Sequence, residues 1–375
     1  MQYRSSGIIL KTQKLGEADR ILKILTPENG LVSAIAKGAR RMNSSFAAKT
    51  QTLNHCDFLL ARGKNLDIVS EVSIVNNFLL GCSDLIALNL AFFASEITEK
   101  ISNECESTRN FFELLDIYLR YLKSITAGHL NKSINSENAG TGACEQSDDI
   151  KTNQQLLLSI EFLWCIICEL GYKPDFNTCA LTRKRRQAKQ IPQYFDLSSG
   201  SICSTEGYEL YRQGYHTDDH IVPLKKFTFK LLDALDRSPL SSLETDFQIS
   251  FQNAEIEDCK QSQEGCADTQ LSSRFNTENK IITLREILIE DFLVNYMQVS
   301  LGEIKANLKA GVQHQQSRLE DNTLSSLPEV AFSLSSQNNE LKSCLQLLYK
   351  HIEFQIHKEC KSWKALEEVI YSTNS

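Results

Sequence analysis

Four cations stand close together in a stretch of the chain that contains no acid. From Lys37 to Lys49 the sequence holds Lys37, Arg40, Arg41 and Lys49 without any Asp or Glu, although the whole chain carries a formal net charge of -7. Gly38, beside the first cation, lets the backbone come close to an anion. Cations concentrated in this way favour a surface that binds phosphate groups. We call residues 37–49 the basic loop.

A second basic run lies between two cysteines. Residues 183–189 hold five cations and no acid, with Cys179-Ala-Leu-Thr182 before them and Cys203-Ser-Thr-Glu206 after them. Two Cys-x-x-Cys knuckles roughly twenty residues apart would be a strong zinc signal. Thr182 and Glu206 replace the second cysteine of each pair, so we predict a degenerate zinc-finger-like loop without zinc at 176–207, the knuckle loop. Its basic run is a second phosphate-contacting surface or, alternatively, a solvated loop.

The search for catalytic groups finds no established motif. The chain has no Walker-type phosphate loop, no His-Glu-x-x-His and no Gly-x-Ser-x-Gly. Cys165 and Cys168 have redox or metal spacing, but their apolar neighbours favour core packing. His216 and His220 are four residues apart with a loop-like Asp-Asp between them, which leaves a metal site as the less favoured alternative. We predict a protein that is not an enzyme and holds no cofactor.

Charge and composition limit the partners. Residues 1–80 contain eleven Lys and Arg less six acids, a net +5, in a chain whose total is -7. This asymmetry indicates a basic module that meets a polyanion, with a merely solvated basic surface as the alternative. The chain has 375 residues, of which 42% are hydrophobic and 23% charged, as in globular proteins. It shows neither a bilayer-spanning apolar run nor a signal peptide, so we expect no membrane partner, reduced cysteines and a cytoplasmic location.

The residue pattern predicts an α+β protein of several domains. Short alternating segments separated by turn residues predict a small β-barrel over residues 1–80, with strands at 7–10, 20–25, 31–36, 53–61 and 66–75. Helical periodicity follows, and it predicts an α-helical domain at 81–237 and 281–310. Its expected helices lie at 84–104, 111–122, 156–170, 205–213, 223–235 and 283–308.

Polar stretches interrupt the helical pattern. Residues 124–155, 238–280 and 311–340 are rich in Ser, Asn, Gln and acids, and we predict that they are disordered insertions. Residues 341–375 are predicted to form a C-terminal helical extension.

Several short motifs occur in a fixed order in the first eighty residues. They are Gly7-Ile8-Ile9-Leu10-Lys11, Gly16-Glu17-Ala18-Asp19-Arg20, Thr26-Pro27-Glu28-Asn29-Gly30, Ala36-Lys37-Gly38-Ala39-Arg40-Arg41, Ser44-Ser45, Leu53 and Arg62-Gly63-Lys64 with Leu66. Weaker support comes from residues 170–175, the Cys179 and Cys203 region, and residues 195–200. In this order the motifs resemble RecO, a bacterial family of DNA repair and recombination mediators.

The resemblance implies a fold and a function. The barrel would be an OB-fold, followed by an α-helical domain that a zinc-finger-like loop interrupts. The family binds single- and double-stranded DNA, contacts RecR and single-stranded DNA-binding protein, and helps to load RecA, so the resemblance places the protein at the nucleoid. The half-lost knuckles, the insertions and the C-terminal extension depart from many members.

We expect the DNA-binding residues to be cations that neutralise phosphates. They are Arg4, Lys11, Lys37, Arg40, Arg41, Lys49, Arg62, Lys64, Arg183, Lys184, Arg185 and Arg186. Aromatic residues are sparse in the barrel (Tyr3, Phe46, Phe58 and Phe78), so contacts to the backbone should dominate and sequence preference should be weak. A protein that holds two strands by their phosphates leaves the base edges free to pair, as annealing requires.

Two other functions remain open from the residues. An OB-fold module could recognise RNA or an acidic protein tail without any repair role. A hydrolase or nuclease acting on nucleic acid is less favoured, because no carboxylate or metal cluster is visible in the sequence.

Overall fold

The computed structural model describes residues 1–103, 105, 108–134, 141–187, 190–213, 220–237 and 327–372. For residues 127–148 and 327–337 it describes the helices and not the side chains. Residues Met1–Ser241 and Glu329–Ser375 form one compact unit, to which the following description applies. The insertion predicted at 238–280, the helix predicted at 283–308 and His216 lie outside the described residues.

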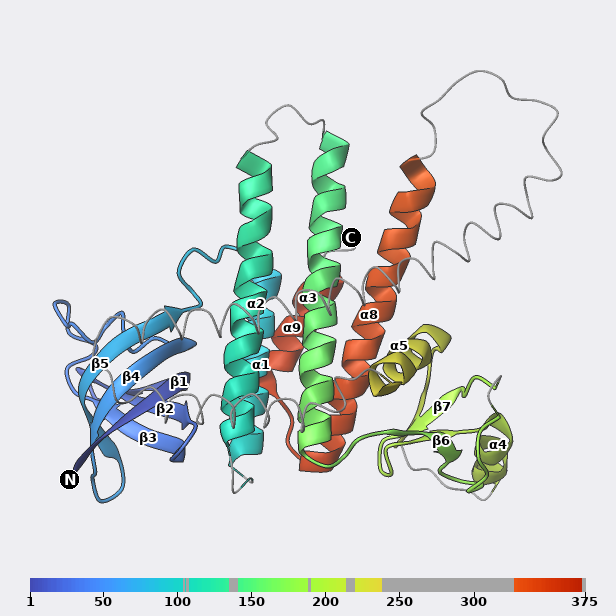
Figure 1. The fold of residues 1–375 in the computed structure, drawn as a ribbon, viewed down its shortest axis with the longest axis horizontal. Coiled ribbons are helices and arrows are strands. Elements are labelled where there is room, and N and C mark those ends of the chain that lie inside the picture. Colours follow the sequence, from blue (N-terminus) through green and yellow to red (C-terminus); the bar gives the residue numbers. More distant parts are fainter. Residues whose placement is uncertain are drawn as a thin grey trace, which may run out of the picture. The chain divides into compact units, whose positions relative to one another are not determined.

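The first part of the chain is the predicted barrel. Its strands are β1 (Gln2–Leu15), β2 (Asp19–Thr26), β3 (Gly30–Ala36), β4 (Asn54–Ala61) and β5 (Asp67–Asn77). They close in the order β1-β2-β3-β5-β4, and β1 also pairs with β4 (Figure 1). All pairs are antiparallel except β3 with β5, where Ala34 lies opposite Asp67. This five-stranded arrangement confirms the OB-like barrel expected from the sequence.

Alternation along the strands builds the barrel core. Ile9, Leu22 and Ile24 are fully buried and pack with Phe58 of β4 in one cluster. Gly7 lies where β1 crosses β2, and a Cβ atom on it would come within 2.4 Å of the Ile24 Cγ2 atom. The close crossing of these two strands therefore requires glycine at this position.

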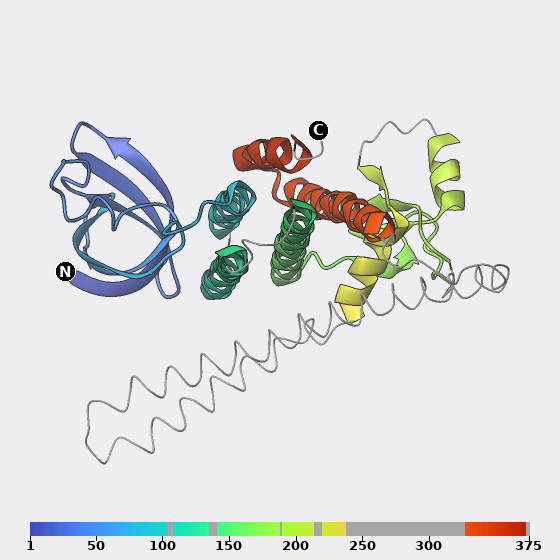
Figure 2. The same ribbon diagram turned by 90° about the horizontal axis from the view of Figure 1, so that it is seen from above.

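A helical body follows the barrel. It contains α1 (Leu85–Ser102), α2 (Arg109–Ile134), α3 (Thr141–Glu169), α8 (Leu327–Ile356) and α9 (Lys361–Ser372). In Figures 1 and 2, α2 runs beside α3, and α9 lies beside α1. Asp84 caps α1 by accepting hydrogen bonds from the Ile86 and Ala87 amides at 2.9 and 3.1 Å. The α+β class predicted from the sequence is confirmed.

The knuckle loop belongs to a small second sheet. Its strands are β6 (Asp175–Cys179), β7 (Tyr194–Asp196), β8 (Ser201–Cys203) and β9 (Ile221–Pro223), in the order β6-β8-β7-β9. Helices α4 (Thr205–Gln213) and α5 (Lys226–Arg237) accompany it. On α8, His351 is buried, and its two ring nitrogens lie 3.1 Å from the carbonyl oxygens of Leu197 and Tyr172. This histidine joins the small sheet to the helical body.

The barrel is fixed to the helical body by polar contacts. The Ser95 hydroxyl on α1 donates to the Leu10 carbonyl at 2.9 Å. Lys23 on β2 pairs with the nearly buried Glu99 on α1 at 2.8 Å. These bonds satisfy backbone and charged groups that the contact removes from water.

Two of the predicted insertions are helical where the structure describes them. Helix α2 continues to Ile134 and α3 begins at Thr141, so most of 124–155 is helix, and α8 begins at Leu327, inside the stretch 311–340. The prediction of disorder from polar composition was wrong here, because the other half of each helix is apolar and nucleates the helix. Once a helix is nucleated, adding polar residues to it costs little.

The C-terminal helices are part of the body rather than an appendage. The rings of Tyr349 on α8 and Trp363 on α9 stack with centroids 4.3 Å apart, and Phe93 of α1 lies 5.2 Å from Trp363. The sequence placed these residues in an extension because their partners on α1 lie far away along the chain.

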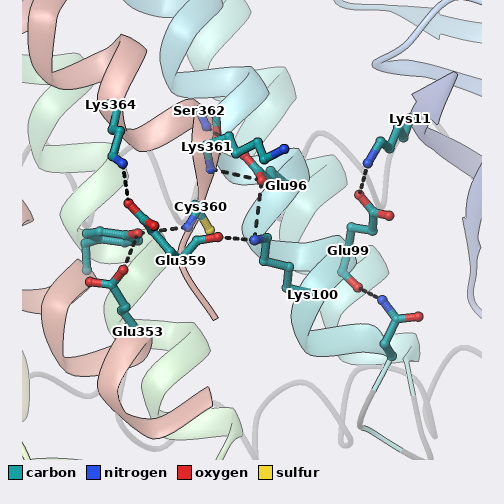
Figure 3. Close-up of polar contacts among 12 residues, drawn as sticks. Lys11, Glu96, Glu99, Lys100, Glu353, Glu359, Cys360, Lys361, Ser362 and Lys364 are labelled. Carbon is teal, nitrogen blue, oxygen red and sulfur yellow. Dashed lines mark hydrogen bonds and ion pairs between the residues drawn. The ribbon is translucent and has the colours of Figure 1, made fainter. Parts of the chain in front are cut away.

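Glu96 of α1 caps the start of α9 (Figure 3). Its carboxylate accepts hydrogen bonds from the amides of Lys361 and Ser362 at 3.0 and 2.7 Å and from the Ser362 hydroxyl at 2.5 Å. Burial alone would raise the pKa of Glu96, but the hydrogen bonds from Ser362 and Lys361 outweigh burial and hold the pKa below its ordinary value of 4.5. A helix that begins far away in sequence thus depends on a side chain of α1.

We predict that Glu96→Gln destabilises the protein by about 1–2 kcal/mol, the usual cost of losing a helix cap. The carboxylate's contribution is present above pH 4.5 and is lost as the pH falls through the lowered pKa, so the variant should also lose part of its acid sensitivity. Urea unfolding at several pH values measures both effects. Glu368→Gln, which removes an exposed carboxylate from α9, is the control, and equal stability of the two variants would contradict the capping role.

Candidate nucleic-acid interface

The start of the basic loop is bound to the turn between β1 and β2. The Gly38 amide donates to the Asp19 carboxylate at 2.8 Å, and the Arg40 amide donates to the Ala18 carbonyl at 2.9 Å. The Arg40 guanidinium reaches the Gly16 carbonyl at 2.8 Å. Gly38 has a φ of 67°, a conformation that glycine adopts without strain. The loop therefore leaves the barrel in a direction set by the neighbouring turn.

The end of the basic loop is held by Arg20 of β2. The Arg20 Nη1 atom donates to the Thr50 carbonyl at 2.8 Å and lies 3.0 Å from the Thr50 hydroxyl oxygen. It also reaches the Ala47 carbonyl at 3.4 Å. Burial, and then the nearby charge of Arg40, hold the pKa of Arg20 below its usual value. An arginine that satisfies loop carbonyls in this way fixes the loop and is not free to bind phosphate.

The four predicted cations of the loop divide into two kinds. Lys37 and Arg41 are exposed to solvent. Arg40 is half-buried and bound to Gly16, and the Lys49 ammonium donates to the Val72 carbonyl on β5 at 3.0 Å. Lys37 and Arg41 can therefore meet a phosphate directly, whereas Arg40 and Lys49 hold the loop in place.

The loop between β4 and β5 adds two more exposed cations, Arg62 and Lys64. The Arg62 guanidinium lies over the Tyr3 ring, 5.4 Å from its centroid, and the Tyr3 hydroxyl donates to Asp67. Burial, followed by the hydrogen bond and charge of Asp67, raises the pKa of Tyr3 to about 12. Arg4 is exposed on β1. OB-folds bind oligonucleotides with the β2–β3 face and with the loops between β1 and β2 and between β4 and β5. Arg62 and Lys64 lie on the second of these loops, and the basic loop is bound to the first, whereas Arg4 lies opposite Leu59 of β4.

Few aromatic rings are available for stacking on bases. Phe58 and Phe78 are each only 2% exposed and belong to the core. Tyr3 and Phe46 are partly buried and pack against the same core. This distribution agrees with the expectation that contacts to phosphates dominate.

Lys11 does not join the other predicted residues. Its ammonium lies 3.8 Å from Glu99 of α1 (Figure 3). Glu99 also pairs with Lys23. The sequence suggested a groove residue because Lys11 is one of the cations of the predicted barrel. The structure instead gives Lys11 a partner in the contact between the barrel and α1.

The second basic run divides in the same way as the first. Arg183, Lys184 and Arg185 are exposed. Arg186 is largely buried, and its Nε atom donates to the Phe176 carbonyl at 2.8 Å. Its guanidinium also lies 5.0 Å from the Phe229 ring centroid. Arg183 and Arg185 therefore remain open to an anion, Lys184 is exposed but pairs with Glu206, and Arg186 joins the loop to α5.

The residues of the knuckle loop do not fit a zinc site. The Cys179 sulfur accepts from the Ser204 amide at 3.3 Å and lies 3.5 Å from the Ser204 hydroxyl. Glu206 is exposed and pairs with Lys184 at 3.7 Å. Two thiols remain where structural zinc needs four ligands. Among the described residues, no three metal-ligating side chains are grouped so that they could hold an ion.

Hydrogen bonds take the place that a metal would have at Cys179. Burial alone would raise its pKa, but hydrogen bonds from Ser204 and Thr182 outweigh burial and lower the pKa to about 7. Burial, followed by the charges of Asp196 and Cys179, raises the pKa of Cys203 to about 12. Thr182 and Ser204 thus join the two arms of the loop through the Cys179 sulfur.

The structure also brings together a polar relay that the sequence did not indicate. The Ser6 hydroxyl lies 2.9 Å from His55 Nε2, and His55 Nδ1 lies 2.8 Å from the Asp116 carboxylate. The order resembles a hydrolase triad. His55, however, is 9% exposed and packs edge-on against Phe112 with centroids 5.4 Å apart. The relay therefore joins the barrel to α2. It could not be predicted from the sequence because its members are spread over 110 residues of chain.

Comparison with known proteins places both parts of the chain in one family. Residues 1–78 match the family model of the recombination protein O N-terminal region, and residues 147–278 match that of its C-terminal region. The second match includes the whole knuckle loop.

Individual relatives give the same result. A protein of Bifidobacterium longum strain NCC 2705 named DNA repair protein RecO is 31% identical over 247 residues, covering 64% of this chain and 85% of the relative. One of Dehalococcoides mccartyi strain CBDB1 with the same name is 29% identical over 201 residues, covering 54% of this chain and 68% of the relative. One of Thermobifida fusca strain YX is 47% identical over 76 residues, covering 20% of this chain and 31% of the relative.

The length and apolar character of the helices bear on whether any of them could cross a bilayer. Within the part of the chain that the structure describes, none has the length and apolar character that crossing a membrane demands.

We predict that the knuckle loop is stable without zinc. A chelator should leave the thermal midpoint unchanged, and Ser204→Ala should destabilise the protein by about 1 kcal/mol. It removes a hydroxyl that lies 3.5 Å from the Cys179 sulfur and accepts a hydrogen bond from the Gly207 amide at 3.1 Å. Thermal unfolding measures both, and Ser45→Ala, at an exposed serine of the basic loop, is the control. Stoichiometric zinc in the purified protein, together with a chelator-induced fall in the midpoint, would refute this prediction.

Proposed function

The chain belongs to the RecO family of DNA repair proteins, and from this premise we propose that it is a non-enzymatic mediator that binds single- and double-stranded DNA and promotes strand annealing. The observation that carries the proposal is the basic loop. Its backbone is bound at both ends to the barrel, while Lys37 and Arg41 are left exposed.

The proposed mechanism uses charge rather than base recognition. Lys37 and Arg41, with Arg62 and Lys64 from the β4–β5 loop, neutralise phosphates and release the counterions condensed on the DNA. Because the loop is already ordered, little conformational entropy is lost when DNA binds. Contacts to phosphates leave the hydrogen-bonding edges of the bases free, so a bound strand can still pair with its complement.

The knuckle loop supplies a second basic surface. Arg183, Lys184 and Arg185 would hold a second strand, or a second segment of the same strand, by its phosphates. Exposed cations on two separate loops support this part of the proposal.

Family membership supports a proposal about the partners. We propose that the protein acts with RecR and single-stranded DNA-binding protein and assists the loading of RecA on DNA, which would place it at the bacterial chromosome. The helical body, built from α1, α2, α3, α8 and α9, is the part of the described chain that the DNA surface leaves available for protein partners.

We predict that Lys37→Ala/Arg41→Ala weakens the binding of single-stranded DNA and flattens its salt dependence. The logarithmic salt slope should fall by about 1.4, or ~0.7 for each phosphate that the variant no longer neutralises. Fluorescence anisotropy at several salt concentrations measures the slope. Lys364→Ala, which removes an exposed cation from α9, is the matched control. Wild-type binding that does not depend on salt would contradict the mechanism, and a preference for structured RNA over DNA would favour a module without a repair role.

A second prediction concerns annealing. The protein should accelerate the annealing of complementary strands coated with single-stranded DNA-binding protein, and Arg183→Ala/Lys184→Ala/Arg185→Ala should reduce the rate more than it reduces the affinity for one strand, because a second grip is removed. Quenching of paired fluorophores follows the rate, with Lys37→Ala/Arg41→Ala compared in parallel. If the triple variant anneals as fast as the wild type, the knuckle loop has no such role.

A further inference from the structure

An apolar side chain, that of Met42, is fully exposed to solvent on the basic loop. Met42 is 101% exposed, the highest value among the large hydrophobic residues of the described chain. It follows Arg41 directly, and Asn43 after it is also exposed. Loops usually place polar residues at such positions, because an exposed apolar side chain gains nothing from water.

Met42 is held out by an ordered turn. The Ser44 amide donates to the Arg41 carbonyl at 3.1 Å, which closes a turn with Met42 at its second position. The preceding turn is closed by the Arg41 amide and the Gly38 carbonyl, also at 3.1 Å. Both turns stand on the part of the loop that Asp19 and Ala18 bind to the barrel. The methionine therefore projects from a fixed base.

The surroundings of Met42 select the kind of partner. Lys37 and Arg41 are exposed on the same loop, and the loop contains no acid. A docking site for a protein segment would offer several apolar side chains together, whereas the nearest residues along the chain, Arg41 and Asn43, are polar and exposed. One apolar side chain beside phosphate-binding cations is instead the arrangement of proteins that insert a wedge between stacked bases.

We propose that Met42 is a wedge that enters a step between neighbouring bases of DNA bound by the basic loop. This inference rests on the proposed function and adds a contact to the bases, which the cations alone do not make. The cations bring the sugar-phosphate backbone to the loop, and the flexible thioether then exchanges water for the faces of two bases. Since the contact is apolar, it carries no sequence preference. Its consequence is a locally unstacked strand whose bases are presented one at a time to a complement.

The test uses a single-stranded oligonucleotide that carries 2-aminopurine, whose fluorescence rises when the base loses its stacked neighbours. Binding of the wild-type protein should increase the fluorescence. Met42→Ala should lose most of this increase and bind more weakly, while its salt slope, measured by anisotropy on the same oligonucleotide, stays close to that of the wild type because no phosphate contact is removed. Met42→Leu should keep the increase because it retains the apolar volume. Leu85→Ala, at a 60% exposed leucine on α1, is the control for removing an exposed hydrophobic side chain.

The outcomes separate the wedge from the proposed function. Wild-type protein that does not bind the oligonucleotide would contradict the proposed function itself. Binding without a rise in fluorescence, or an equal rise with Met42→Ala, would overturn the wedge while leaving phosphate binding intact. Reduced binding of an acidic peptide by Met42→Ala, with unchanged 2-aminopurine fluorescence, would identify a protein partner and also overturn the proposal.

Discussion

The hydrogen bonds from Arg20 to the carbonyls of Thr50 and Ala47 are the constraint on which the DNA surface depends. The connection between β3 and β4 is long and contains few large apolar residues that could anchor it in the core. A free loop of this kind would lose its conformational entropy each time it met a ligand. Arg20 at one end and Asp19 at the other remove that loss by fixing the loop before DNA arrives.

The same division between bound and exposed cations recurs through the described chain. Arg20, Arg40 and Lys49 donate to backbone carbonyls, and Arg186 does so in the knuckle loop. These cations satisfy backbone carbonyls in loops, at Thr50 and Gly16, and in strands, at Val72 and Phe176. They leave a neighbouring set exposed, represented by Lys37, Arg41 and Arg185. In each basic segment, arginines and lysines bound to backbone carbonyls thus hold the loop that carries the exposed cations.

How far the sequence predicts this fold depends on the range of the interactions. The barrel was predictable because alternation in segments such as 31–36 is local, and the strand observed at Gly30–Ala36 matches it closely. The sheet formed by β6, β8, β7 and β9 was not, because strands of three to five residues carry too little periodicity. The site was only half predictable, since Arg40 and Arg41 are identical in type and adjacent. Which of them binds Gly16 and which faces solvent is decided by tertiary contacts.

The central claim is that DNA meets the barrel at the basic loop and the β4–β5 loop. Amide hydrogen exchange, measured with and without single-stranded DNA at low salt, tests this most directly, because it reports on every segment without altering any residue. The account predicts that DNA slows exchange chiefly in residues 37–49 and 62–66, with smaller effects at 183–187. Slower exchange confined to the helical body, with both barrel loops unchanged, would contradict it.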